Sequence, residues 1–180
     1  MAIKQSLRET PAQTGIEVFN AGMVLLNNYI PMLFDRLKLT EGHRFINEQA
    51  QLEAVHYLQY LVTGQETTDE AWLPLNKLMC GLPLSQPVPP GISIPGSAKE
   101  LINGLFTAII GYWPAIGDTS ADGFRGNWLV RKGLLTEGDE KWDLHVEKRP
   151  YDLLIGKSPF SFSVIKFPWM NKPVHVSWPF

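Results

Sequence analysis

The chain has 180 residues, of which 44% are hydrophobic and 19% charged, and its formal net charge is -2 at pH 7. A chain of this length can bury roughly 70% of the surface that it exposes when unfolded, so no disulfide or metal is needed for stability. This composition argues against intrinsic disorder, and the near-neutral charge argues against a nucleic-acid partner.

The composition also bears on where the chain is made. Cys80 stands alone, so it cannot form an intramolecular disulfide, and synthesis in a reducing cytosol is the simpler interpretation. The first ten residues lack the apolar core of a signal peptide, and no stretch approaches ~18 uncharged apolar residues. We therefore expect a soluble chain without a membrane partner.

The first predicted elements are a strand and a helix. A short strand is predicted at residues 16–19, after which Asn20 can N-cap a helix over residues 21–38. Apolar spacings of three and four also allow this helix to begin earlier, with residues 10–13 as its capping box. Pro31 should kink either version of the helix.

Two further helices and a long connection follow. Apolar residues recur on one face of residues 46–62, and Gly64 provides a C-terminal stop, so a second helix is predicted there. The capping pattern of residues 67–70 predicts a short third helix over residues 72–80. Residues 83–96 are rich in proline and are predicted to form a long, ordered or semi-ordered extended connection.

Another two helices are predicted in the next part of the chain. A capping box at residues 97–100 opens the fourth helix, which Pro114 ends, and its two adjacent columns of apolar residues predict that it is nearly buried. The pattern at residues 119–122 opens a fifth helix that Gly133 closes.

After about residue 140 the period of the apolar residues changes from helical to two. Alternation at residues 142–146 and further runs at 151–155, 161–167 and 174–178 predict four short strands in an antiparallel meander. Residues 16–19 can add an edge strand. The predicted fold class is therefore α+β, with about five helices packed with a small C-terminal antiparallel β-meander.

The domain organisation follows from the same pass along the chain. Residues 1–13 are polar, contain one proline and are predicted to be a flexible N-terminal segment. Since the remainder holds neither an internal repeat nor a low-complexity tract, residues 14–180 are predicted to form a single α+β domain.

No motif in the sequence predicts catalysis, a metal site or a cofactor. Glu53 and His56 are three residues apart on a helix, but the matching pairs that helical metal sites need are missing, so a hydrogen-bonded His56 is favoured. Cys80 is predicted to be a small buried hydrophobic residue rather than a nucleophile. Asn76 and Lys77 either cap backbone groups around Gly81 or contact a neighbouring subunit.

Aromatic residues are concentrated near the C-terminus. They are more numerous than one face of a small sheet is expected to bury. Core packing and a protein interface, where Trp and Tyr dominate binding, both remain open for this group. Its members are Phe167, Trp169, Met170, Trp178 and Phe180.

Several short blocks carry a family resemblance. The clearest are His56–Gly64 (HYLQYLVTG), Leu75–Leu84 (LNKLMCGLPL) and Ile165–Met170 (IKFPWM). Weaker blocks lie in order between and around them at Asn20–Leu26, Pro31–Phe34, Ala108–Trp113, Asp118–Ser120, Gly123–Arg125, Trp142–Glu147, Tyr151–Leu154 and Ser158–Ser161. Their order and spacing resemble the conserved C-terminal domain of the tape measure proteins of bacterial contractile injection systems.

This resemblance implies a structural and assembly role rather than an enzymatic one. Such proteins belong to phage-tail-like particles of the antifeeding-prophage and Photorhabdus virulence cassette type. The resemblance implies docking on the baseplate hub, spike or inner-tube proteins, oligomeric copies, a contribution to tube length, and residence in the cytoplasm during assembly and in the extracellular particle after release. Candidate interface or family-motif residues are His56, Gln59, Asn76, Lys77, Cys80, Lys166 and Trp169.

The number of residues limits how this chain could act as a molecular ruler. Even as one helix, 180 residues would span only roughly 270 Å, and 14 Pro and 15 Gly prevent one rod. A compact domain of this size has a radius of gyration of roughly 16 Å. We therefore expect an anchoring terminal domain, either part of a longer ruler or a stand-alone copy.

One alternative function stays open. In it the chain is an adaptor or assembly chaperone that binds payload or partner segments through residues 83–96 and the aromatic C-terminus, and that is absent from the finished particle.

Overall fold

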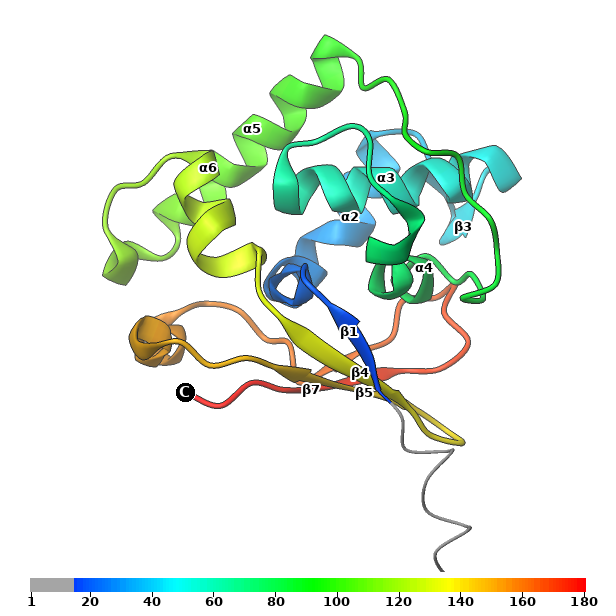
Figure 1. The fold of residues 1–180 in the computed structure, drawn as a ribbon. Coiled ribbons are helices and arrows are strands. Elements are labelled where there is room, and N and C mark those ends of the chain that lie inside the picture. The colour runs from blue at the N-terminus through cyan, green and yellow to red at the C-terminus, as the bar shows by residue number, and fades with distance from the viewer. Residues whose placement is uncertain (1–14) are drawn as a thin grey trace, which may run out of the picture.

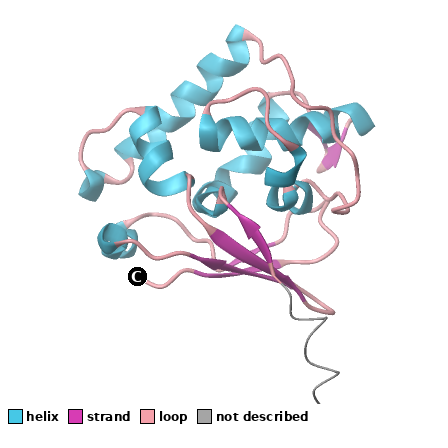
Figure 2. Ribbon diagram, in the orientation of Figure 1, coloured by secondary structure: helices cyan, strands magenta, loops and turns pink. Residues whose placement is uncertain are grey.

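The computed structural model describes residues 15–180, in which helices lie on one side of a five-stranded sheet (Figure 1, Figure 2). This two-layer arrangement confirms the predicted α+β class. The predicted flexible segment 1–13 and the capping box at 10–13 fall outside the described residues.

The sheet has the strand order β1-β4-β5-β7-β6. Its strands are β1 (Ile16–Val18), β4 (Gly133–Glu137), β5 (Trp142–Val146), β6 (Val164–Ile165) and β7 (Val174–Ser177). β5 and β7 are parallel, whereas the other neighbouring pairs are antiparallel. The prediction of an antiparallel meander was therefore wrong, because the chain crosses over between β5 and β7 instead of returning through a tight turn.

Two predicted strands differ from the structure in this crossover. Residues 151–155 lie in a 3₁₀ helix, η6 (Pro150–Lys157), in which Pro150 occupies the first turn and the Asp152 carboxylate accepts a bond from the backbone N–H of Arg149. The run predicted at 161–167 forms only the two-residue β6. The strand predicted at 16–19 is confirmed as β1, which pairs with β4.

The first predicted helix is a 3₁₀ segment, η2 (Ala21–Tyr29), followed by α2 (Ile30–Arg36). α2 begins at Ile30, with Pro31 in its first turn, where the missing N–H costs no hydrogen bond. The predicted kink at Pro31 falls beside the change from the 3₁₀ segment to the α-helix. A small hairpin, β2 (Thr40–Glu41) with β3 (Arg44–Phe45), follows.

The second helix is confirmed as α3 (Glu48–Thr63), which ends at Gly64 in the left-handed conformation. The predicted third helix is divided into η3 (Glu70–Trp72) and α4 (Pro74–Met79). Pro74 has no N–H to continue the first segment, so α4 begins anew there.

The fourth helix is α5 (Gly96–Gly111), and Pro95 rather than the predicted Ser97 box precedes it. It is less buried than predicted, since Leu101 and Leu105 remain half-exposed while Ile102 and Phe106 are buried. A short 3₁₀ segment, η4 (Pro114–Ile116), follows.

The fifth helix is α6 (Ala121–Phe124), which continues as the π-helical η5 (Arg125–Leu129). Ser120 caps α6 as the pattern indicated, by accepting a 2.9 Å bond from the Gly123 N–H. The helix ends at Leu129, earlier than predicted, because Val130 is already extended and the Arg131 N–H donates to the Phe19 carbonyl at 3.0 Å. Gly133 then begins β4.

The core lies between the two layers. Val18, Leu135, Leu144 and Val174 point from the sheet into a continuous cluster of buried apolar residues. The opposite face of the sheet, which carries His145 and Leu134, is open to solvent. Within residues 15–180, no helix has both the length and the apolar character to cross a membrane.

Candidate functional site

A buried amide network fixes α4 against the rest of the fold. Asn76 has no exposed surface, and its Nδ2 donates to the Val55 carbonyl at 3.0 Å and to Gln59 Oε1 at 3.2 Å. Asn20 Nδ2 donates to the same Gln59 oxygen at 2.8 Å and to Asn76 Oδ1 at 2.7 Å. Asn20 thus links the segment before η2 to α3 and α4 instead of capping η2, although its own Oδ1 is buried without a hydrogen-bond partner within residues 15–180.

Lys77 holds the loop that follows α4. Its side chain is 4% exposed, and Nζ donates to the Leu84 carbonyl at 3.1 Å and pairs with Glu70 Oε2 at 3.3 Å. The Val88 N–H, which donates to Glu70 Oε1, is the main cause that lowers the pKa of Glu70, and Lys77 acts in the same direction. Lys77 therefore ties the loop to η3.

The end of α4 is closed by contacts with α3 and the C-terminal region. Gln51 Nε2 donates to the Cys80 carbonyl at 2.8 Å, and Trp169 Nε1 donates to the Met79 carbonyl at 2.7 Å. Gly81 has φ +75°, and a Cβ there would overlap the Trp169 carbonyl oxygen. Only glycine fits this close approach of two backbones.

Cys80 is fully buried, as the sequence indicated, and burial raises the pKa of its thiol well above the ordinary value. The thiol therefore stays protonated near neutral pH. Within residues 15–180, no three His, Cys, Asp or Glu side chains lie where they could hold one metal ion.

His56 binds the proline-rich segment that follows α4, which we call the strap (residues 83–95). Its Nε2 bonds the Pro89 carbonyl, which can only accept. The strap is held further by Glu66, whose backbone carbonyl and carboxylate accept from the N–H groups of Ile92 at 3.0 Å and Ile94 at 2.7 Å. The strap is thus ordered, and much of its backbone is paired within the chain.

The seven candidate residues separate into three groups. Five contact α4 or belong to its end: Gln59, Asn76, Lys77, Cys80 and Trp169. His56 holds the strap that follows. Lys166 is exposed and lies apart from the network, with Nζ 3.4 Å from the Phe167 carbonyl. Most of these side chains therefore lie beneath a neighbouring surface and hold it in place, instead of being exposed on it.

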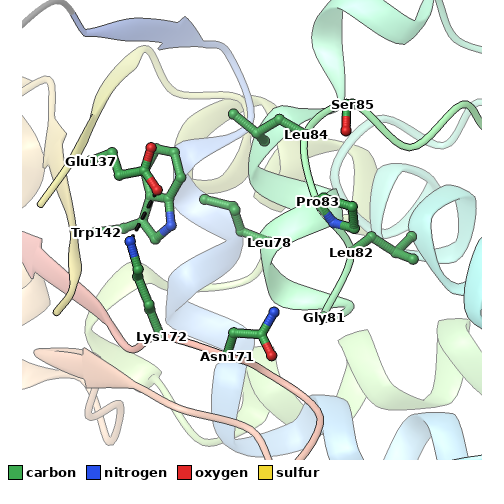
Figure 3. A pocket seen from close by; sticks show the side chains of 10 residues that line it. All are labelled: Leu78, Gly81, Leu82, Pro83, Leu84, Ser85, Glu137, Trp142, Asn171 and Lys172. Atoms are coloured by element: carbon green, nitrogen blue, oxygen red, sulfur yellow. Dashed lines mark hydrogen bonds and ion pairs between the residues drawn. The ribbon is translucent and has the colours of Figure 1, made fainter. Parts of the chain in front are cut away.

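The surface that they support is a pocket of about 420 Å³ (Figure 3). The loop after α4, the β4–β5 hairpin and the segment before β7 form its walls, and its lining residues are Leu78, Gly81, Leu82, Pro83, Leu84, Ser85, Glu137, Trp142, Asn171 and Lys172. In Figure 3, Lys172 and Glu137 face each other at one side as an ion pair of 3.0 Å. The pocket combines an apolar interior with a polar rim.

Only part of this pocket could be found from the sequence. The block Leu75–Leu84 supplies its loop wall, but Glu137, Trp142 and Lys172 come from distant segments that only the folded sheet brings near. No local pattern marks these three residues as partners of the loop.

A second buried polar cluster, around Arg131 and Asp152, was not singled out by the sequence. Both side chains are fully buried, and Arg131 NH1 donates to Asp152 Oδ2 at 2.6 Å. The same oxygen accepts from the Arg149 N–H and from Trp178 Nε1, each at 2.9 Å. Burial acts to raise the pKa of Asp152, but the bonds from Arg131, Trp178 and Arg149 and the charge of Arg131 outweigh it and lower that pKa.

A comparison with protein-family models matched residues 2–178 to the family described as contractile injection system tape measure protein. No curated protein and no solved structure matched the chain. The matched span includes α4, the strap and the pocket that they form with the sheet. The chain therefore belongs to the contractile injection system tape measure protein family.

Proposed function

We propose that this chain is a non-enzymatic structural domain that docks on the hub, spike or inner tube of a contractile injection particle and helps to set tube length. The observation that best supports this proposal is the family match over residues 2–178. Within this span, the block Leu75–Leu84 forms one wall of the pocket. In this proposal residues 14–180 act as one domain, several copies join the particle, and assembly in the cytoplasm precedes release.

The pocket suits the docking of a protein segment. Trp142 and Leu78 offer apolar surface to an inserted side chain, while Ser85 and Asn171 offer hydrogen-bonding groups at the exposed rim. The amide network and the Lys77 bonds hold the loop wall in place before binding, so little ordering entropy is lost on docking.

A substitution at the rim tests the docking role without disturbing the buried network. Ser85→Arg places a long side chain in the pocket mouth and should weaken binding to the purified hub, spike or tube protein by about tenfold or more. Ser97→Arg, an exposed position on α5 outside the pocket, is the matched control and should bind as wild type. Equal affinities of the two variants would contradict docking at this pocket.

The adaptor alternative has less structural support. Its proposed binding segment, the strap, already uses backbone groups at Val88, Pro89, Pro90, Ile92 and Ile94 within the chain. Mass spectrometry of purified particles separates the two functions. A structural domain should be present at a fixed ratio to the tube protein, whereas an adaptor should be absent from finished particles.

A further inference from the structure

Residues of α2 and α5 line an open groove on a different part of the molecule from the pocket. Figure 1 shows the positions of these two helices. Its volume is about 600 Å³, and it shares no lining residue with the pocket. Met32 and Tyr112 line it with exposed fractions of 44% and 61%. Two large apolar side chains are thus exposed to solvent beside half-buried Leu101 and Leu105.

Both walls of the groove repeat at helical spacing. On α5 the lining residues Leu101, Leu105, Ala108 and Tyr112 follow steps of four, three and four. Such steps form a ridge that packs into a groove on the surface of another helix. From Glu100 to Tyr112 the wall is about 18 Å long, which corresponds to a partner helix of about three turns.

Gly104 lies in the middle of this wall. A Cβ built there has nothing within 4 Å, so no contact within residues 15–180 explains a glycine inside α5. Glycine weakens a helix interior, but it exposes the backbone and lets another helix approach closely. The open backbone at this point of the wall leaves room for the close approach of a partner helix.

The two ends of the groove differ in charge. Tyr29 and Tyr112 lie close together at one end, where burial and then the neighbouring Tyr112 raise the pKa of Tyr29. Arg36 and Glu100 line the groove toward the other end, and neither forms an ion pair within residues 15–180. A partner of complementary charge carries an acidic side chain to pair with Arg36 and a basic side chain to pair with Glu100, both at that end of the groove.

We propose that this groove binds one amphipathic α-helix of a partner protein. The helix presents apolar residues at steps of three and four to Leu101, Leu105 and Tyr112, and it places a carboxylate against Arg36. This second docking surface goes beyond the proposed function, because it operates whether or not the pocket binds the hub or tube.

Photo-cross-linking tests the proposal in cells that assemble the particle. Benzoylphenylalanine replaces Tyr112, the cells are irradiated before lysis, and the cross-linked peptide is sequenced by mass spectrometry. One segment with apolar residues at helical spacing and an acidic residue at the Arg36 end should be captured. A cross-link to a second copy of this chain, to a segment without helical spacing, or to nothing would overturn the proposal.

Two glycines of α5 provide a matched pair of variants. Gly104→Leu fills the groove and should reduce the cross-link by about tenfold or more. Gly111→Leu makes the same change on the same helix, also with nothing within 4 Å, but Gly111 does not line the groove, so the cross-link should persist. Equal yields from both variants would overturn the assignment.

The pocket variant makes the two proposals distinguishable. Ser85→Arg should leave the groove cross-link unchanged even where it abolishes binding to the hub or tube. Arg36→Glu should weaken the cross-link, and replacing the partner's acidic residue by lysine should restore it. Failure of this charge reversal to restore the cross-link would contradict the proposed orientation of the helix.

Discussion

At the scale of single residues, the buried carboxylate of Asp152 is the group whose removal we expect to be most costly for stability. One oxygen accepts from Arg131, Arg149 and Trp178, and Arg131 itself has no exposed surface. Arg131 lies in the segment between η5 and β4, so the bonds of Asp152 connect this segment with η6 and with the C-terminal residue Trp178. Removing the negative charge would leave a buried guanidinium without a counter-charge, which is far more costly than losing an exposed ion pair.

We therefore predict that Asp152→Asn lowers the free energy of unfolding by about 3–5 kcal/mol. The control is Asp122→Asn, which breaks a comparable 3.0 Å pair with Arg125, but Asp122 is 88% exposed and should cost about 1 kcal/mol or less. Urea denaturation of the two variants measures the difference. Similar losses for both would contradict the structural role of the buried pair.

Residue-level prediction from the sequence succeeded where a side chain's surroundings are local. Cys80 is buried as its type indicated, and Lys77 bonds the Leu84 carbonyl as the capping interpretation required. The same interpretation was wrong for Asn76, whose side chain bonds Val55 and Gln59 on α3. Asp152 was not singled out because its partners Arg131 and Trp178 lie 21 and 26 residues away, and no short pattern records that distance.

At the scale of elements, the end of α4 depends on a close backbone contact at Gly81. Gly81→Ala must relieve an overlap with the Trp169 carbonyl in addition to the left-handed strain of about 1–2 kcal/mol. Gly42→Ala, at φ +59° with nothing within 4 Å, carries only that strain and is the control. We predict a larger loss of unfolding free energy for Gly81→Ala in thermal and urea denaturation, and equal losses would contradict the contact.

The strap should depend on pH through Glu66 and Glu70. The backbone bonds from Ile94 and Val88 are the main causes that lower the pKa of each, with Lys99 and Lys77 acting in the same direction. Because the folded pKa values lie below that of an unfolded glutamate, about 4.3, this stabilisation is present above that pH and is lost as pH falls through the folded values.

Hydrogen exchange checks this expectation at single amides. The Val88 and Ile94 N–H groups should exchange faster below about pH 4, after correction for intrinsic rates, while the amides of α3 stay protected. Glu66→Gln should remove the pH dependence at Ile94 and leave that at Val88. Uniform loss of protection across the chain would instead indicate global unfolding and contradict local release of the strap.

Element boundaries show what a sequence pattern can and cannot decide. Gly64 ends α3 as predicted, because a left-handed terminus selects glycine directly. The first helix was predicted as α-helical although η2 is a 3₁₀ segment, since burial of every residue from Ala21 to Asn27 hides the period that would separate the two. Pro74 and Pro150 begin new short helices that apolar spacing alone did not indicate.

At the scale of the whole molecule, one core links the two layers and supports a single-domain proposal for residues 14–180. We predict one cooperative unfolding transition, with the same midpoint by tryptophan fluorescence and by far-ultraviolet circular dichroism. Trp113, Trp128, Trp142 and Trp178 report on both layers. Two separated transitions would contradict the single domain.

The fold class could be predicted because the apolar period changes from helical to two along the chain. The sheet order could not, because β5 and β7 are parallel and pair across a crossover that contains η6. The candidate site was likewise only partly predictable from the sequence. The block Leu75–Leu84 marked its loop wall, whereas Trp142 and Lys172 join the pocket only through that topology.

We propose that this domain takes part in building the particle and in setting tube length. The most direct measurement is the yield and tube-length distribution of particles, read from electron micrographs, in cells that lack this chain and in the same cells with the chain restored. We predict that particles without the chain are missing or abnormal in length and that the restored chain corrects both. Normal yield and an unchanged length distribution without the chain would contradict it.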